Sequence, residues 1–204
     1  MGSAAAAEAT ARGEAATDAV ASVTIGAQVW MARNLEVTTF RNGDPIAVAV
    51  GNAAWAAAAR DRMPALTSYG DDPTYRERFG LLYNHHAVVD PRGLCPPGWR
   101  IPDNHDWDAL EAHLGRSGAA TALKSAVGWP GSGNGSNASG FDARPGGFRI
   151  QDGTSRLGGR VGYWWSLSTD ATDQVTSILL FDYDGRIFRI QYPRGLGQSV
   201  RCLR

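Results

Sequence analysis

Cysteine and histidine side chains are the first residues to consider in this chain for metal ligation or catalysis. The sequence holds two cysteines and four histidines. Cys95 and Cys202 lie far apart, in neither a C-x-x-C pair nor a metal-ligand spacing. Two interpretations stay open from the residues alone, a single long-range disulfide and two buried free thiols. A disulfide would imply an oxidising compartment or a thermophile.

The histidines form no metal-binding pattern. His85 and His86 are adjacent, and adjacent residues on a strand point to opposite faces, so they cannot easily share one metal. His105 and His113 lack the His-Glu-x-x-His spacing. No Ser-His-Asp order, paired carboxylate motif or phosphate loop stands out. The sequence therefore predicts a protein that is not an enzyme, with packed or partly exposed histidines.

Oxygen-bearing side chains gather around a stretch of glycine, serine and asparagine, residues 128–140. Asn134, Asn137 and Asp142 could supply oxygen ligands to calcium. The stretch lacks the Glu-Pro-Asn pattern that sugar-binding lectins typically use, so we favour a polar solvated loop and predict no cofactor, with a structural calcium ion as the alternative. A polar loop of this length inside a compact domain is usually functional or mobile.

The C-terminal part of the chain is the best candidate for a binding surface. Residues 175–183 and 186–192 are two β-favouring runs separated by an Asp-Gly dipeptide, which is a strong hairpin signal. The first run is apolar on both faces, so either both of its faces are buried or one of them is a binding surface. The second run carries an apolar row on one face, formed by Phe188, Ile190 and Tyr192. This row either covers a second layer of core or is an interaction site.

Several local patterns predict the elements that must position this surface. Alternating apolar residues predict a strand with a glycine-marked turn or bulge, and cap and stop residues predict three helices. The strand is Val23–Trp30, and the helices are Asn52–Arg60 with an Asn cap, one from Asp103 or Asn104 to Gly115, and one over Ala119–Val127.

Composition limits the functional classes. The chain has 204 residues and a formal net charge of zero, so no basic patch argues for nucleic acid. No apolar run is long enough to span a membrane. Residues 1–22 are rich in alanine without a continuous apolar core, which predicts a disordered leader rather than an intact signal peptide.

Motifs along the rest of the chain resemble one family. They occur in order from about Val23 to Arg204 and look like the Fibrobacter succinogenes major paralogous domain. The matching segments are Ile25-Gly26-x-Gln28-Val29-Trp30-Met31-Ala32-x-Asn34-Leu35, Gly80-x-Leu82-Tyr83-Asn84, Leu94-Cys95-Pro96-x-Gly98-Trp99-Arg100-Ile101-Pro102, Trp107, Ser139-Gly140-Phe141-x-Ala143-x-Pro145-Gly146-Gly147-Phe148-Arg149, Gly162-Tyr163-Trp164-Trp165-Ser166 and Ser199-Val200-Arg201-Cys202.

The resemblance implies an α+β domain over residues 23–204 with a C-type lectin-like fold. In that fold two helices flank small antiparallel sheets, the C-terminal half is rich in hairpins, and the chain ends lie close together. Cysteines matching Cys95 and Cys202 recur in the family, so the resemblance implies that these two lie near each other.

The same fold serves as scaffold for the variable proteins of diversity-generating retroelements, which change adenines so that Asn codons become nearly any residue. On this resemblance the variable region is about residues 163–198. Leu167, Leu179, Phe181, Phe188 and Ile190 are all reachable from an Asn codon by adenine changes alone.

The resemblance therefore implies a binding module that presents variable side chains to a protein or glycan ligand. Aromatic and aliphatic side chains would anchor the ligand, and polar ones would adjust hydrogen bonds. The alternatives are a non-variable bacterial surface adhesin of the same family and, on fold likeness only, a relative of formylglycine-generating enzymes. The family suggests a cell-surface or secreted protein. The expected ligand-binding residues are Leu167, Ser168, Asp170, Gln174, Ser177, Leu179, Phe181, Tyr183, Phe188, Ile190 and Tyr192.

Overall fold

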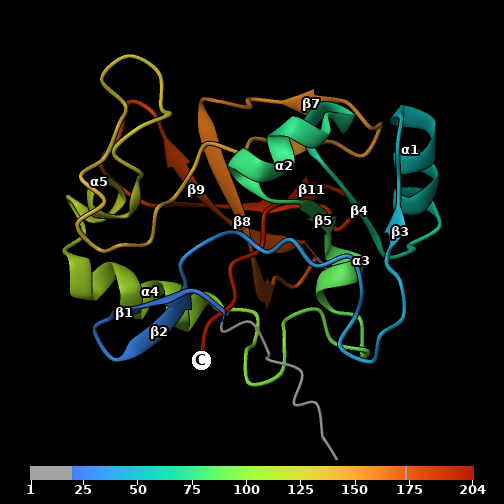
Figure 1. The fold of residues 1–204 in the computed structure, drawn as a ribbon, viewed down its shortest axis with the longest axis horizontal. Helices are drawn as coiled ribbons and strands as arrows, with labels where there is room; N and C mark the ends of the chain where they lie inside the picture. Colours follow the sequence, from blue (N-terminus) through green and yellow to red (C-terminus); the bar gives the residue numbers. More distant parts are fainter. Residues whose placement is uncertain (1–19, 173) are drawn as a thin grey trace, which may run out of the picture.

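The computed structural model describes residues 20–172 and 174–204. All but the last three residues of the predicted leader, residues 1–22, lie outside this part. The described chain has an α+β fold in which short helices surround small sheets (Figure 1). None of its helices is both long and apolar enough to cross a membrane.

The strands form three separate sheets. The smallest pairs β1 (Ser22–Ile25) with β2 (Gln28–Met31). A three-stranded antiparallel sheet has the order β10-β9-β8, built from β8 (Val161–Thr169), β9 (Val175–Phe181) and β10 (Phe188–Tyr192). A six-stranded sheet has the order β3-β4-β5-β11-β6-β7 and is antiparallel except for the β3–β4 pair. Its strands are β3 (Ala47–Val48), β4 (Ala65–Thr67), β5 (Leu82–Asn84), β6 (Phe148–Arg149), β7 (Ser155–Arg156) and β11 (Gly197–Gln198).

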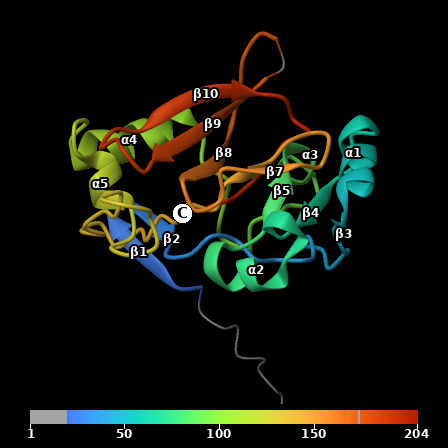
Figure 2. The same cartoon turned by 90° about the horizontal axis from the view of Figure 1, so that it is seen from above.

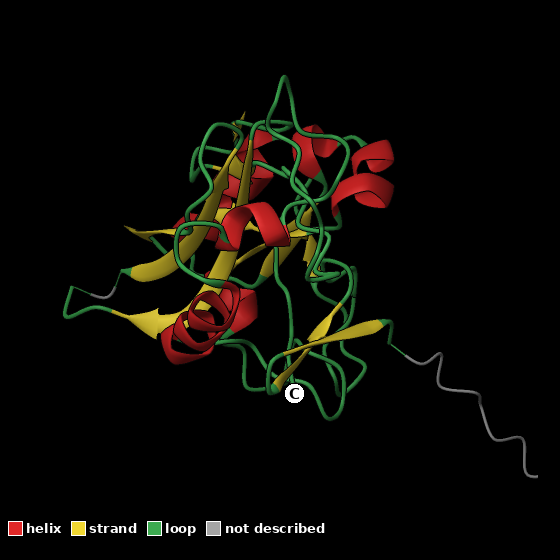
Figure 3. Ribbon diagram, turned by 90° about the vertical axis from the view of Figure 1, so that its left-hand side faces the viewer, coloured by secondary structure: helices red, strands yellow, loops and turns green. Residues whose placement is uncertain are grey.

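The segment predicted as the first strand forms a hairpin of β1 and β2. Gly26 has a φ of 61°, which favours glycine, and turns β1 back onto β2. A Cβ on Gly26 would also lie 3.0 Å from the His113 ring. The N–H of Val29 donates to the carbonyl oxygen of Arg204 at 3.2 Å, and the reverse bond is 2.9 Å. The hairpin therefore lies beside the C terminus (Figure 3).

The helices match the prediction best where their caps are local. α4 (Asn104–Leu114) begins after Asp103, which forms a capping box with Asp106, and Gly115 follows its last turn. α1 (Asn52–Arg60) has the predicted bounds, but its cap is Gly51 and makes no side-chain cap bond. The remaining helices are α2 (Pro73–Phe79), α3 (His85–Val88), α5 (Ala119–Leu123) and a 3-10 helix at Tyr69–Asp71.

The β8–β9 pair separates two hydrophobic cores. Trp165 and Leu179 point into one core, while Trp164 and Ile178 point into the other. All four side chains are buried. Because both faces of β9 are covered, its two-sided apolar pattern reflects double burial rather than display.

The glycine-rich loop, residues 128–140, is fixed against α5. Its N–H groups at residues 135, 136, 137 and 139 donate to the carbonyls of Ser125, Thr121, Lys124 and Ala122 at 2.9–3.2 Å. Three of these carbonyls lie in or directly after α5, where helix ends lack partners. A Cβ on Gly135 would lie 2.4 Å from two of these carbonyl oxygens. The loop is therefore a cap for α5 that requires glycine, and neither the functional nor the mobile interpretation is needed to explain it.

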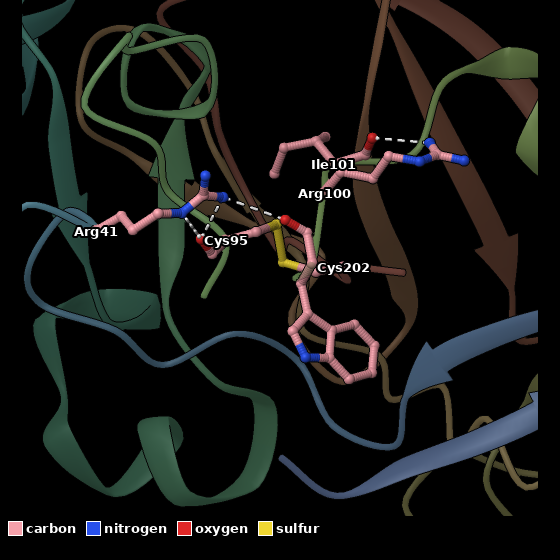
Figure 4. The surroundings of a disulfide bond; sticks show 6 residues. Arg41, Cys95, Arg100, Ile101 and Cys202 are labelled. Atoms are coloured by element: carbon pink, nitrogen blue, oxygen red, sulfur yellow. Dashed lines mark hydrogen bonds between the residues drawn. A yellow bond between two sulfur atoms is a disulfide. The ribbon is translucent and has the colours of Figure 1, made fainter. Parts of the chain in front are cut away.

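A disulfide joins Cys95 to Cys202, so the two lie near each other, as the resemblance implied, and the first of the two open interpretations is confirmed. The cysteines are 107 positions apart in the sequence, and both are buried. The Arg41 guanidinium donates to the carbonyl oxygen of Cys95 at 2.9 and 3.1 Å and to that of Trp99 at 3.2 Å (Figure 4). The bridge ties the middle of the chain to its end.

Asp71 and Arg149 form a partly buried ion pair between the 3-10 helix and β6. Both carboxylate oxygens of Asp71 accept from Arg149, and the Asp71 carboxylate also accepts from the Gly51 N–H and the Thr67 hydroxyl. Only 1% of the Arg149 side chain is exposed, compared with 22% of Asp71. The hydrogen bond from Arg149 lowers the pKa of Asp71 below its ordinary value.

We expect Asp71→Asn to lower the free energy of unfolding by roughly 2–3 kcal/mol at neutral pH, since it leaves a buried guanidinium without its charge partner. The folded pKa of Asp71 is depressed, so the stability it contributes is present above the unfolded pKa and is lost as the pH falls through the folded pKa. Urea unfolding of both proteins from neutral to acidic pH should show the difference shrinking below pH of about 4. Asp61→Asn removes an exposed pair with Arg60 and serves as control, expected to leave the free energy of unfolding nearly unchanged. Equal losses in the two variants would contradict this assignment.

Candidate ligand-binding surface

The edge strand β10 is held through one of its two faces. Arg189 donates to Asp108 at 2.7 Å and to Glu111 at 2.8 Å, both on α4. Gln191 donates to the Thr176 hydroxyl of β9 at 3.0 Å. Since side chains alternate along a strand, these contacts turn Phe188, Ile190 and Tyr192 to the opposite face.

That opposite face carries a set of apolar side chains, which we call the apolar row. Tyr183 is 77% exposed and Ile190 40%, while the other three members are half-buried. Rings within the row contact one another, with centroids 5.3 Å apart for Tyr183 and Phe181 and 5.1 Å apart for Phe181 and Phe188. The apolar row consists of Phe181, Tyr183, Phe188, Ile190 and Tyr192.

The row rests on aromatic side chains from the core. The Tyr192 ring lies 6.2 Å from Phe148 and 6.3 Å from Tyr163, measured between centroids. Phe148 and Tyr163 are buried and contact each other at 4.6 Å. The exposed edges of the row are therefore supported by a rigid aromatic layer.

The loop between β9 and β10, which carries Tyr183, is held by α5 and the residue after it. Lys124 donates to the carbonyl oxygens of Phe181 at 3.1 Å and Asp184 at 3.2 Å. The Ala120 N–H donates to the carbonyl oxygen of Gly185 at 2.9 Å. Lys124 is buried, and this burial lowers the pKa of its amine. The buried Lys124 amine and the Ala120 N–H thus position the loop without using any side chain of the apolar row.

A second group of expected residues lies at the other end of the β8–β9 hairpin. Leu167 is 41% exposed, and the Ser168 hydroxyl accepts from the Asn104 N–H at 2.9 Å. The Asp170 carboxylate accepts from the backbone N–H groups of Thr172 and Gln174, so it shapes the turn. Gln174 lines an open groove of about 550 Å³ beside β10.

The prediction that Ser177 and Leu179 are exposed is wrong. Both side chains have 0% exposure. The Ser177 hydroxyl accepts from Gln198 of β11 at 2.7 Å, and Leu179 packs into the core that contains the disulfide. Gln198 of β11 covers Ser177, and the core around the disulfide covers Leu179. The local sequence could not indicate either, so neither side chain can reach a ligand on this surface.

We expect Leu179→Ser to lower the free energy of unfolding by roughly 3–4 kcal/mol, because it opens a cavity and buries a hydroxyl. Leu167→Ser is the matched control, since 41% of Leu167 is exposed, and it should cost about 1 kcal/mol or less. Chemical denaturation of both variants measures the difference. If Leu179→Ser leaves the free energy of unfolding nearly unchanged, Leu179 is not buried in the core and belongs to the candidate surface.

Residues of the family motifs meet in a buried hydrogen-bonded frame behind the surface. The side-chain oxygen of Asn34 accepts from Trp164 Nε1 at 2.9 Å and from Arg201 Nε and Nη2 at 3.1 and 2.8 Å. The amide nitrogen of Asn34 donates to the carbonyl oxygen of Phe79 at 2.7 Å. A Cβ on Gly80 would lie 2.8 Å from the Asn34 Cβ. We call Asn34, Trp164 and Arg201 the buried frame.

The sequence pattern of the Fibrobacter succinogenes major domain matches residues 23–204 of this chain. The chain belongs to this family. No curated protein matches the chain, and no solved structure matches it. In this Fibrobacter succinogenes major domain, the motif residues of the buried frame therefore belong to the scaffold and not to the apolar row.

The oxygen atoms considered for calcium in this Fibrobacter succinogenes major domain already accept hydrogen bonds. Asn134 accepts from the Trp129 N–H, Asn137 accepts from the Asp142 N–H, and Asp142 accepts from Arg144. Among the described residues, no group of three or more His, Cys, Asp or Glu side chains could hold a metal ion.

His85 and the two cysteines of the domain have structural surroundings. His85 is buried, contacts the Trp165 ring edge-on at 5.2 Å, and lies 2.8 Å from Arg194 Nη1. Both cysteines are joined in the disulfide.

Sequence reasoning missed a groove of about 350 Å³ beside Tyr183. Its walls include Arg160, Asp182 and the start of the glycine-rich loop at residues 130–133. A Cβ on Gly133 would lie 2.7 Å from the Asp182 carbonyl oxygen, so the two loops touch. The run of glycines was a signal of close backbone approach, but its partner could not be found from local sequence.

Proposed function

We propose that this chain is a binding protein that presents the apolar row to a protein or glycan ligand. The main support for this proposal is that Tyr183 and Ile190 are exposed beside the half-buried aromatic members of the row. Apolar side chains that gather at a surface and have few rotatable bonds make effective anchors. The grooves next to Tyr183 and Gln174 add polar side chains at both ends of the row.

The scaffold supports this proposal because it does not depend on the exposed side chains. The loop is held through backbone carbonyls, β10 is held by Arg189 and Gln191, and the buried frame lies elsewhere. Exposed substitutions usually change stability by no more than about 0.5 kcal/mol. Ligand choice could therefore change while the fold stays constant.

The proposal includes a C-type lectin-like form of the α+β fold and a role as the variable protein of a diversity-generating retroelement. Two features support the lectin-like form. β2 bonds to the last residues of the chain, and α4 and α5 lie along the three-stranded sheet. In support of diversification, the exposed or half-buried Leu167, Phe181, Phe188 and Ile190 are reachable from Asn codons by adenine changes.

Binding can be tested with panels of immobilised extracellular proteins and glycans. The purified chain should bind a small subset, and Tyr183→Ser combined with Ile190→Ser should abolish that binding while the thermal unfolding curve stays nearly unchanged. Val48→Ser combined with Val50→Ser is the matched control, because these side chains are 61% and 64% exposed but lie in or next to β3. If the control loses binding equally, the apolar row is not the site.

The retroelement role has a separate test in the neighbouring DNA. We expect a near-copy of the segment that encodes residues 163–198, differing at adenines, next to a reverse-transcriptase gene. If the locus lacks both, the alternative is a non-variable surface adhesin of the same family, and the binding proposal still stands on its own experiment.

A further inference from the structure

A cavity of about 190 Å³ opens between α2 and the buried frame. Asn34 and Arg201 of the frame line it, together with Phe79 and Gly80 at the end of α2. All four are buried. Figure 2 shows that α2 and β10 lie on opposite sides of the molecule, so this cavity is separate from the apolar row.

Three carboxylates line the cavity, and two of them are engaged in ion pairs. Asp142 pairs with Arg144 at 2.8 Å. Glu36 pairs with Arg76 at 3.5 Å. Glu77, an exposed residue of α2, is the third.

The arginines that line the cavity outnumber these carboxylates by four to three. Beyond Arg144, the lining includes Arg33, Arg78 and Arg201. Arg33 and Arg78 are exposed and, among the described residues, neither forms an ion pair with a carboxylate. Arg78 lies over the Phe79 ring at 5.0 Å, which directs its guanidinium along the cavity wall. The carboxylates of Glu36, Glu77 and Asp142 face these cations, so the lining has an excess of one positive charge.

Arg201 is a buried cation whose direct partners are all neutral. Its side chain donates to Asn34 Oδ1 and to the carbonyl oxygens of Met31 and Phe141. A guanidinium has five N–H donors, and these bonds use four of them, which leaves one hydrogen on Nη2. Burial lowers the pKa of Arg201 to about 9, while the negative charge of Asp142 acts in the opposite direction, so Arg201 is still charged at neutral pH.

We propose that this cavity binds a small oxyanion, a carboxylate or phosphate group, between Arg201 at its floor and Arg33 and Arg78 at its rim. The anion accepts the remaining Nη2 hydrogen of Arg201 and charge-assisted hydrogen bonds from the rim, and it adds a negative charge to a lining in which arginines outnumber carboxylates. A volume of about 190 Å³ admits a molecule of roughly the size of a benzene ring or slightly larger. The ligand is therefore small, or it is a single acidic group of a larger molecule.

Calorimetric titration of the whole chain with inorganic phosphate, and separately with acetate, tests the proposal at an ionic strength held constant with chloride. We expect saturable binding of one anion per chain and a higher melting temperature in its presence. The anion that binds more tightly identifies the natural group as phosphate or carboxylate.

The variant for this test is Arg33→Gln combined with Arg78→Gln, which changes only exposed side chains. Loss of two charge-assisted bonds should weaken the preferred anion at least about tenfold. Arg116→Gln combined with Arg156→Gln removes the same charge from exposed positions outside the cavity and should change affinity less than about twofold. Absence of saturable binding for both anions, or equal weakening in the two double variants, would overturn the proposal.

Discussion

Asn34→Leu should lower the free energy of unfolding by about 4–5 kcal/mol, a loss comparable to the whole stability of a marginal domain. The change removes the acceptor for Trp164 Nε1 and for two N–H groups of Arg201. It also leaves the carbonyl oxygen of Phe79 without its donor. Each buried polar group left without a partner costs about 1–3 kcal/mol, and a buried charge costs more.

Urea unfolding followed by tryptophan fluorescence measures this loss, because Trp164 itself belongs to the buried frame. Asn42→Leu is the matched control, since Asn42 is exposed and bonds only to its neighbour Asp44, and it should cost less than about 1 kcal/mol. Asn34→Asp retains the acceptor and should be less damaging than Asn34→Leu. If leucine is tolerated better than aspartate at position 34, the frame does not depend on this acceptor.

Replacing Cys95 and Cys202 by alanine should lower the free energy of unfolding by roughly 4–5 kcal/mol. The bridge joins positions 107 apart, so in the chain-entropy account its loss frees a long loop in the unfolded state. Both sulfurs also pack in the larger core, where alanine leaves space.

Denaturant unfolding with and without a thiol reductant measures the contribution of the bridge. Reductant should destabilise the unaltered chain by a similar amount and should not affect the double alanine variant. A reductant effect that persists in the variant, or alanine variants as stable as the parent, would show that the bridge contributes little.

The parts of the fold that the sequence predicted are those decided within a few residues. Asp103 caps α4 through the N–H of Asp106, and Gly115 ends it, all inside one continuous segment. The β9–β10 hairpin was likewise predicted, because two β-favouring runs flank a turn. Gly26 was recognised as a turn or bulge, but whether the chain reverses there depends on the C-terminal residues that β2 pairs with.

The candidate surface was only partly predictable, because exposure depends on what covers a strand from far away in the sequence. Leu179 and Ile190 are both apolar and share one face of the hairpin, yet the core buries the first, and the second stays 40% exposed. The cavity beside Arg201 was not predicted at all. Its lining comes from segments around residues 33, 78, 142 and 201, which only the folded chain brings together.

The position of Lys124 also determines how this protein can be modified chemically. It is the one lysine in the sequence, and it is 4% exposed beneath the β9–β10 loop. Acylating dyes, biotin esters and amine crosslinkers therefore find no lysine side chain at the surface. An introduced surface lysine would be the one lysine side chain open to such reagents, so a label or a solid support could be attached there, away from the apolar row.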